Sequence, residues 1–130
     1  MIAVDSSAIL AMALGEDDAD RFAGPLTGAP CLVGWPTLFE VFLVLRGKGK
    51  TKALEVVDLW RDSSNVAAIP FDHSLFEHAR VAFGQYGKGI HPARLNFGDC
   101  MSYALAKRED LPLLYKGEDF AKTDIASALP

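Results

Sequence analysis

The chain has 130 residues, of which half are hydrophobic and 10% aromatic, and its formal net charge at pH 7 is −4. This length leaves no room for two ordinary domains, and the apolar content excludes a disordered chain. The acidic balance argues against a general nucleic-acid binder, since such proteins usually carry a basic surplus. The longest nearly apolar stretch, CLVGWPTLFEVFLVL, is interrupted by Pro36 and Glu40. It is shorter than the roughly 18–20 apolar residues of a membrane span.

We therefore expect one soluble globular domain over residues 1–130, located in the cytoplasm. No secretory signal is predicted, because Asp5 stands where such a signal would carry Lys or Arg. Cys31 and Cys100 lie far apart, without a C-x-x-C motif or a histidine at zinc spacing. We interpret both cysteines as buried thiols.

The first half of the chain alternates between short apolar strands and helical patterns. A strand at 2–4 leads into helical segments at about 7–14 and 16–23. A strand at 31–33 then precedes a helix over about 36–46 that starts with Pro36, a position where the missing N–H does no harm.

The second half continues the alternation. A helix over about 51–62 has Thr51 as its expected cap, and Asp72 is the expected cap of a helix that runs to about residue 83. The other expected elements are a strand at 66–69, a helix from Gly98 or Asp99 to about 108, a strand in LPLLY, and a turn at 117–123 with at most a short helix.

Strands separated by helical crossovers predict an α/β fold with a mostly parallel sheet covered by helices on both faces. In such sheets, ligands gather at the carboxyl ends of the strands. Asp5 directly follows the first expected strand, and Asp119 comes shortly after the last one. Both carboxylates are therefore candidates for a functional site at this edge of the sheet.

Four carboxylates occupy positions that need an explanation. A charge at Asp5 lies between a core strand and an apolar helix, and Glu40 lies in LFEVFLVL, a helix that is apolar on every side. Asp99 heads a helix, and Asp119 lies in a turn. The aspartates have ordinary alternatives, since Asp5 and Asp99 could cap helices and Asp119 could be a turn residue.

If these four acids meet in one pocket, their like charges repel and shift one another's pKa, and a divalent cation is the natural compensation. Carboxylates without histidine or thiolate favour the hard ions Mg²⁺ or Mn²⁺. We therefore expect a metal site formed by Asp5, Glu40, Asp99 and Asp119.

Four blocks of the sequence together resemble a known family. VDSSAIL, PTLFEVFLVL, LNFGDCMSYALA and LPLLYKGEDFAKTDI, in this order and at these separations, resemble a PIN domain, most closely a ribonuclease toxin of the VapC type. The resemblance spans nearly the whole chain. It implies a three-layer α/β/α sandwich, RNA cleavage that depends on Mg²⁺ or Mn²⁺, a homodimer, and inhibition by a cognate antitoxin.

The resemblance also implies roles for individual residues. The family's acidic quartet falls on Asp5, Glu40, Asp99 and Asp119, and its small hydroxyl residue falls on Ser7 or Ser6. Thr123 and Asp124 match the Thr-Asp of the family's ending. We expect Asp5 and Asp99 to contact the metal directly, with Glu40 and Asp119 completing the shell directly or through water. Ser7 is expected to orient Asp5, and Thr123 is a further supporting candidate.

Basic residues gather in two loops. The stretch RGKGKTK contains Arg46, Lys48, Lys50 and Lys52, and a second loop contains Lys88 and Arg94. These residues are candidates for holding the RNA backbone, which predicts salt-dependent binding. For RGKGKTK alone, a solvated turn between helices is the alternative.

Other functions fit the sequence less well. GKGKT would need glycine in place of Val44, and a preceding strand, to form a phosphate loop. HSLFEH is one residue longer than the zinc motif H-x-x-E-H. The strongest alternative is a non-catalytic PIN-like module that binds a partner protein or structured RNA through apolar side chains such as Phe39, Phe42 and Trp60.

Overall fold

The structure is a computed structural model that describes residues 1–130. Its sheet has four strands: β1 (Ile2–Val4), β2 (Cys31–Gly34), β3 (Val66–Ile69) and β4 (Leu113–Leu114). All neighbouring strands pair in parallel, in the order β3-β2-β1-β4. β1 therefore lies inside the sheet, between β2 and β4, although it comes first in the chain.

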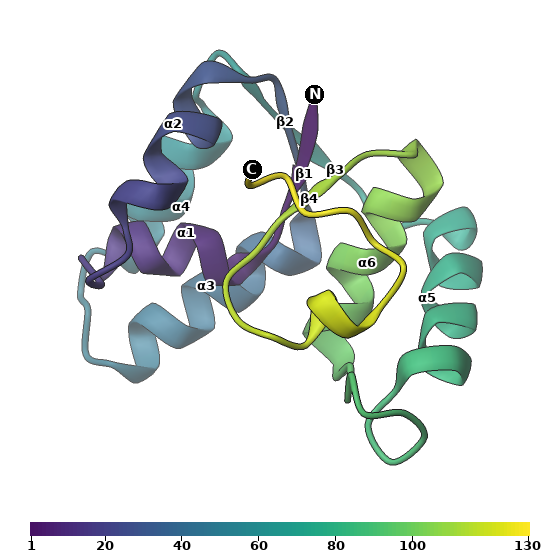
Figure 1. Ribbon diagram of the computed structural model, residues 1–130. Helices are drawn as coiled ribbons and strands as arrows, with labels where there is room; N and C mark the ends of the chain where they lie inside the picture. Colours follow the sequence, from purple (N-terminus) through teal and green to yellow (C-terminus); the bar gives the residue numbers. More distant parts are fainter.

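Helices cover both faces of the sheet, which gives the expected three-layer α/β/α arrangement (Figure 1). The helices are α1 (Ser6–Ala13), α2 (Asp20–Gly28), α3 (Trp35–Gly47), α4 (Ala53–Arg61), α5 (His73–Tyr86), α6 (Phe97–Glu109) and the short 3-10 helix η1 (Phe120–Lys122). None of them is long and apolar enough to cross a membrane.

The two faces have separate hydrophobic cores because side chains alternate along each strand. Ile2 and Val4 of β1 pack with residues of α1, α2, α3 and α4. Ala3, between them, points to the other face and packs with residues of α5 and α6. Both cysteines are free and buried, as expected, and burial raises the pKa of the Cys100 thiol to about 11.

Several helix boundaries differ from the sequence predictions. α2 begins at Asp20 rather than near residue 16 and continues past Pro25. Phe22 and Leu26, four residues apart on one face, are buried in the core, and their packing holds the helical conformation in spite of the proline. Thr51 does not cap α4, because Lys52 occupies the cap position without a side-chain hydrogen bond.

The ends of α5 and α6 show how local capping decides where a helix starts. Asp72 caps α5 as expected, its Oδ1 accepting a 2.9 Å bond from the Leu75 N–H, and the helix extends to Tyr86. α6 begins at Phe97 because Asn96 accepts the Asp99 N–H while Asp99 accepts the Asn96 N–H. This reciprocal capping box fixes the first turn of α6.

The carboxyl ends of the strands collect the segments that carry the acids. Asp5 follows β1 directly, α3 starts immediately after β2, and residues 115–125 follow β4. The C-terminal segment then returns along the outer edge of β4, where Leu113 bonds to Ala126 and Ala128. In Figure 1 this yellow segment runs beside β4.

Candidate active site

Asp5 is a buried carboxylate, only 3% exposed, at the end of β1. Its Oδ2 accepts bonds from the Ser7 hydroxyl at 2.6 Å and from the Ser7 N–H at 3.1 Å, so it caps α1. Its Oδ1 accepts a 2.6 Å bond from the Ser102 hydroxyl. Asp5 therefore caps α1, which was the ordinary alternative for this residue, and Ser7 also holds its carboxylate in place.

Ser7 and Ser102 link Asp5 to three other segments. The Ser7 oxygen accepts the Lys116 N–H at 2.9 Å, which ties the segment after β4 to the start of α1. The Ser102 oxygen lies 3.3 Å from the Thr37 hydroxyl of α3, and both groups are buried. Hydroxyl groups thus fix the orientation of the Asp5 carboxylate from both sides.

Glu40 lies in the second turn of α3 and is partly buried. Burial raises its pKa, and the negative charge of Asp5 raises it further, whereas a hydrogen bond from Ser6 lowers it. Its carboxylate packs against Gly98 in the first turn of α6. Glu40 therefore lies against the turn of α6 that carries Asp99, within the electrostatic influence of Asp5.

Asp99 is influenced by the negative charges of the other three expected acids. Its pKa is raised to about 6, first by burial and then by the negative charges of Asp5, Asp119 and Glu40, while the Asn96 N–H lowers it. The other three expected carboxylates are therefore close enough to influence Asp99, although the four come from separate parts of the chain. Asp99 also keeps its ordinary role in the capping box.

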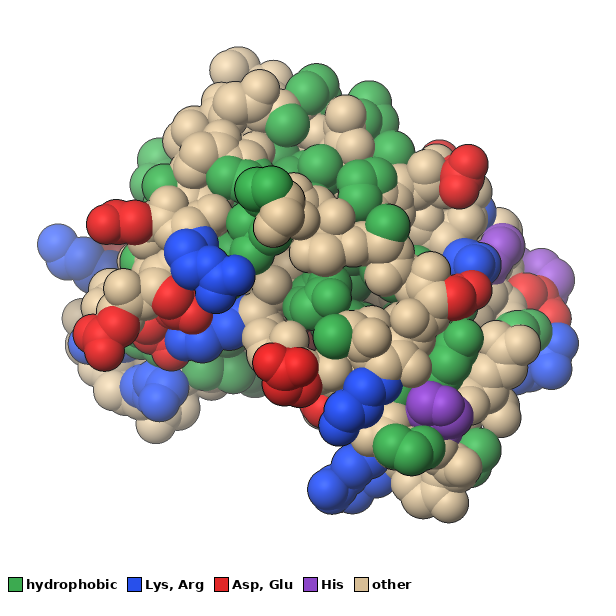
Figure 2. Space-filling model, in the orientation of Figure 1, with side chains coloured by type: hydrophobic (Ala, Val, Ile, Leu, Met, Phe, Trp, Pro, Cys, Tyr) green, Lys and Arg blue, Asp and Glu red, His purple; other side chains and the backbone are tan.

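Asp119 is exposed and lies beside two cations. It shares a polar hollow of about 260 Å³ with Lys88, Arg94 and Asn96. Figure 2 shows acidic side chains at the lower edge of the molecule, next to basic side chains over the loop that follows α5. Neither Lys88 nor Arg94 forms an ion pair. Both side chains are therefore available to bind an anion.

The other basic residues and Thr123 are placed differently. Arg46 lies six positions beyond Glu40, about 9 Å further along the α3 axis. Lys48, Lys50 and Lys52 follow in the exposed turn and do not line the hollow beside Asp119. The Thr123 hydroxyl donates to Phe120 and accepts the Ile125 N–H, so it stabilises the turn after Asp119 and contacts none of the four carboxylates.

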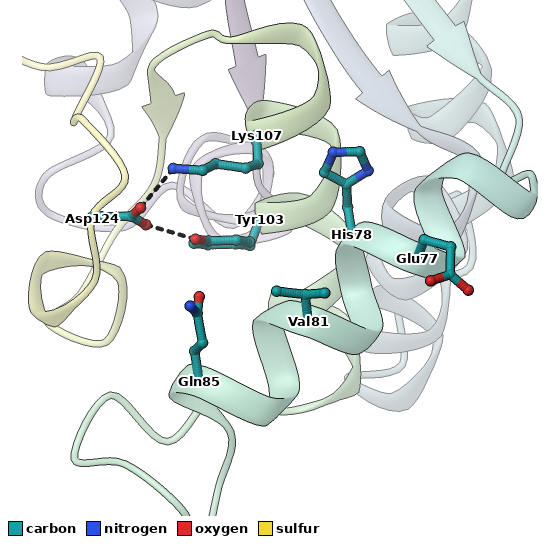
Figure 3. Close-up of a pocket in the computed structure, with 7 residues that line it drawn as sticks. All are labelled: Glu77, His78, Val81, Gln85, Tyr103, Lys107 and Asp124. Carbon is teal, nitrogen blue, oxygen red and sulfur yellow. Dashed lines mark hydrogen bonds and ion pairs between the residues drawn. The ribbon is translucent and has the colours of Figure 1, made fainter.

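Asp124 anchors the C-terminal segment on α6. It accepts 2.6 Å bonds from the Tyr103 hydroxyl and from Nζ of Lys107. These residues line an open hollow of about 540 Å³, whose other wall is formed by α5 (Figure 3). Tyr103 and Lys107 therefore hold the C-terminal segment against α6 through Asp124.

The comparisons with known proteins show the family of the chain. The PIN domain family matches residues 2–126. "Ribonuclease VapC" of Mycolicibacterium smegmatis is 38% identical over 125 residues, which cover 95% of this chain and 97% of that protein. "Ribonuclease VapC30" of Mycobacterium tuberculosis is 40% identical over 129 residues, 98% of each chain. The chain belongs to the VapC family of PIN-domain ribonuclease toxins.

Solved structures show the VapC fold at much lower identity. Mycobacterium tuberculosis VapC20, described as a "Sarcin-Ricin loop cleaving toxin", has a TM-score of 0.82 at 18% identity, with 100% of both chains covered. A "Toxin-antitoxin complex from Klebsiella pneumoniae" has a TM-score of 0.69 at 16% identity, covering 95% of this chain and 93% of that one. At these identities, the likeness concerns the fold.

The chemistry of the VapC acids fits a hard divalent ion, because all candidate donors are carboxylate oxygens. The crowding of negative charge around Asp99 is the electrostatic situation that a cation relieves. As the side chains stand, no three acidic, histidine or cysteine residues are close enough together to hold a metal ion. Mg²⁺ does not need three protein ligands, since it usually keeps several waters and binds through one or two carboxylates.

Sequence reasoning missed Ser102, the buried donor to Asp5. The sequence contains an indication of this role, because Ser102 is the one hydroxyl-bearing aliphatic residue in the largely apolar stretch CMSYALA, most of which is buried in α6. A hydroxyl in such a place needs a polar partner. The partner could not be identified from the sequence, because it lies 97 positions away.

Proposed function

We propose that residues 1–130 form a single PIN-like domain that hydrolyses phosphodiester bonds in RNA with the help of carboxylate-bound Mg²⁺ or Mn²⁺. The observation that supports this most strongly is the placement of the four acids: Asp5 follows β1, Asp119 follows β4, and Glu40 packs against the turn of α6 that carries Asp99. Perturbed carboxylates that converge at the carboxyl ends of parallel strands are typical of functional sites.

Each acid has a proposed role. Asp5 and Asp99 would hold the ion directly, and Glu40 and Asp119 would complete its shell directly or through water. A bound divalent ion supplies an activated water and neutralises charge on the scissile phosphate. Ser7 and Ser102 hold the Asp5 carboxylate in place through their 2.6 Å hydrogen bonds. Thr123 acts indirectly, by shaping the turn behind Asp119.

Lys88 and Arg94 are the proposed contacts to the RNA backbone next to the cleavage site. They share a hollow with Asp119, and no carboxylate neutralises them by ion pairing. The exposed cations at the end of α3, Arg46, Lys48, Lys50 and Lys52, are a second proposed contact, more distant from the acids. Because RNA is the proposed substrate, we place the protein in the cytoplasm.

Two apolar surfaces support the proposed protein partners, a cognate antitoxin and a second copy of the chain. One lies between α3 and α4 and is lined only by hydrophobic residues: Trp35, Leu38, Phe39, Phe42, Leu54 and Val57. The other, between α5 and the start of α6, includes Phe76, Phe83 and Phe97, all substantially exposed. Contiguous apolar surfaces of this kind mark sites of protein association.

The proposal is tested by RNA cleavage with and without EDTA, using Asp5→Asn and Asp99→Asn variants. We expect cleavage that requires Mg²⁺ or Mn²⁺ and a strong loss of activity in both variants. Glu118→Gln is a matched control, because it removes one exposed charge next to Asp119. Near-wild-type cleavage by folded Asp5→Asn and Asp99→Asn proteins would contradict the mechanism. Absence of metal-dependent cleavage in the wild type would favour the non-catalytic binding module.

A further inference from the structure

Gly98 in the first turn of α6 lies directly against the carboxylate of Glu40. A Cβ atom built on Gly98 would lie 2.7 Å from Cδ and 2.8 Å from Oε1 of Glu40, closer than the 3.0 Å that real Cβ contacts keep. The end of the Glu40 side chain therefore occupies the space where any other residue would have its side chain.

Among the glycines that lie within helices, this close approach is particular to Gly98; Gly87, just after α5, also has little space, but there the neighbour is Phe83 of its own preceding turn. The other helical glycines, Gly24, Gly28, Gly47 and Gly84, would place an added Cβ in open space. Backbone conformation does not require a glycine at position 98 either, because its φ is not among the positive values of the chain. Glycine also lowers helix stability by up to about 1 kcal/mol relative to alanine in a helix interior. Space for Glu40 is the remaining reason for a glycine here.

The position of this contact connects it to the acidic residues. Gly98 immediately precedes Asp99, so the same turn of α6 carries one carboxylate and receives another. Glu40 reaches this turn from α3, within the influence of Asp5 and of the Ser6 hydroxyl. Any displacement of the Glu40 carboxylate from α6 therefore changes its distance to Asp5 and Asp99.

We propose that Gly98 is a positioning residue for the active site, because its missing side chain leaves the space that holds the Glu40 carboxylate beside Asp99 and Asp5. This inference rests on the proposed function of Glu40. The obstructing group is the end of a flexible side chain, so an added methyl group moves Glu40 and leaves the fold in place. Gly98→Ala is thus expected to affect the site and not the core.

The experiment is a double-mutant cycle of Gly98→Ala and Glu40→Ala, with Gly84→Ala as the matched control in open space. We expect Gly98→Ala to lower kcat for RNA cleavage by about 10- to 100-fold and to weaken Mn²⁺ binding measured by calorimetry without RNA. Gly84→Ala should match the wild type in both measurements. In the Glu40→Ala background, Gly98→Ala should cause no further loss.

The outcomes separate this inference from the proposed function. If Glu40→Ala loses activity and Gly98→Ala does not, or if the two losses add, the positioning role is wrong and the function stands. If Glu40→Ala cleaves at the wild-type rate, the role of Glu40 fails and the inference fails with it. If Gly98→Ala lowers the melting temperature, adding Glu40→Ala in the double variant must restore it, because the second substitution removes the side-chain atoms that the new methyl group meets. A failure to restore it would overturn the inference.

Discussion

Ser102 of α6 donates a 2.6 Å hydrogen bond to Oδ1 of Asp5, a residue 97 positions earlier in the chain. Both residues are nearly inaccessible to solvent, with exposed fractions of 2% and 3%. A buried charge is tolerated only when hydrogen bonds or counter-charges replace the water that it has lost. Three donors, two from Ser7 and one from Ser102, do this for Asp5.

Ser102→Ala should destabilise the protein and impair cleavage, because it leaves Oδ1 of Asp5 buried without its donor. We expect a loss of about 1–3 kcal/mol in the free energy of unfolding, measured by urea denaturation. Ser63→Ala serves as the control, since the Ser63 hydroxyl donates only to the Leu59 carbonyl oxygen at the exposed end of α4. Equal stability of Ser102→Ala and wild type would show that Asp5 does not depend on this bond.

The double variant Lys88→Gln, Arg94→Gln should bind RNA more weakly and with less dependence on salt. Each lost phosphate contact on a single strand reduces the slope of log K against log salt by about 0.7, so two contacts reduce it by about 1.4. Binding is measured by fluorescence anisotropy in EDTA, where no cleavage is expected. Arg61→Gln is the control, because this arginine is already paired with Asp58 and Asp62. An unchanged slope would place the RNA elsewhere.

The stability contributed by Asp124 should depend on pH in a defined direction. Hydrogen bonds from Lys107 and Tyr103 lower the pKa of Asp124 below its ordinary value of 3.8. A lowered pKa in the folded state means that the stabilisation is fully present above that ordinary value and is lost as the pH falls through the folded value. Asp124→Asn should therefore melt below the wild type at pH 7, with the difference shrinking under acid conditions.

The matched control for Asp124 is Asp17→Asn, since Asp17 is exposed and forms no ion pair. Its melting temperature should follow that of the wild type at every pH. A difference between Asp124→Asn and wild type that stays constant from neutral to acid pH would mean that charge pairing is not the source of the stabilisation.

Divalent ions should raise the melting temperature of the wild type, since they bind only when the acids are assembled. Free ion at 100 times its Kd adds about 2.7 kcal/mol to stability. Asp99→Asn should lose most of this increase, whereas Glu118→Gln should keep it. The measurement is thermal unfolding with increasing Mn²⁺. A similar increase in Asp99→Asn and wild type would indicate that the ion binds at another place.

The fold class was predictable because short apolar segments alternate with amphipathic ones, and this local pattern decides which segments form strands and helices. Helix ends were less predictable. Thr51 has the right chemistry for a cap, yet the cap position falls one residue later, on Lys52, and α4 begins at the buried Ala53. A helical segment was expected at about 16–23, but α2 spans Asp20–Gly28 and includes Pro25, because the packing of Phe22 and Leu26 outweighs the local preference of the proline.

The acids of the candidate site were predictable individually, because a charge in an apolar setting needs a partner. Their supporting residues were not. Ser102 and Gly98 act through contacts with residues distant in sequence, Asp5 and Glu40. The basic residues show the same limit, since Lys88 and Arg94 reach the hollow of Asp119 only through the path of their loop.

The central place of β1 determines when the acidic site can exist. β1 pairs with β4, which comes much later in the chain, and Asp119 follows β4. A nascent chain in which β4 has not yet been synthesised therefore holds Asp5 without Asp119. The order of the elements in the chain thus delays assembly of the four acids until β4 has joined the sheet beside β1.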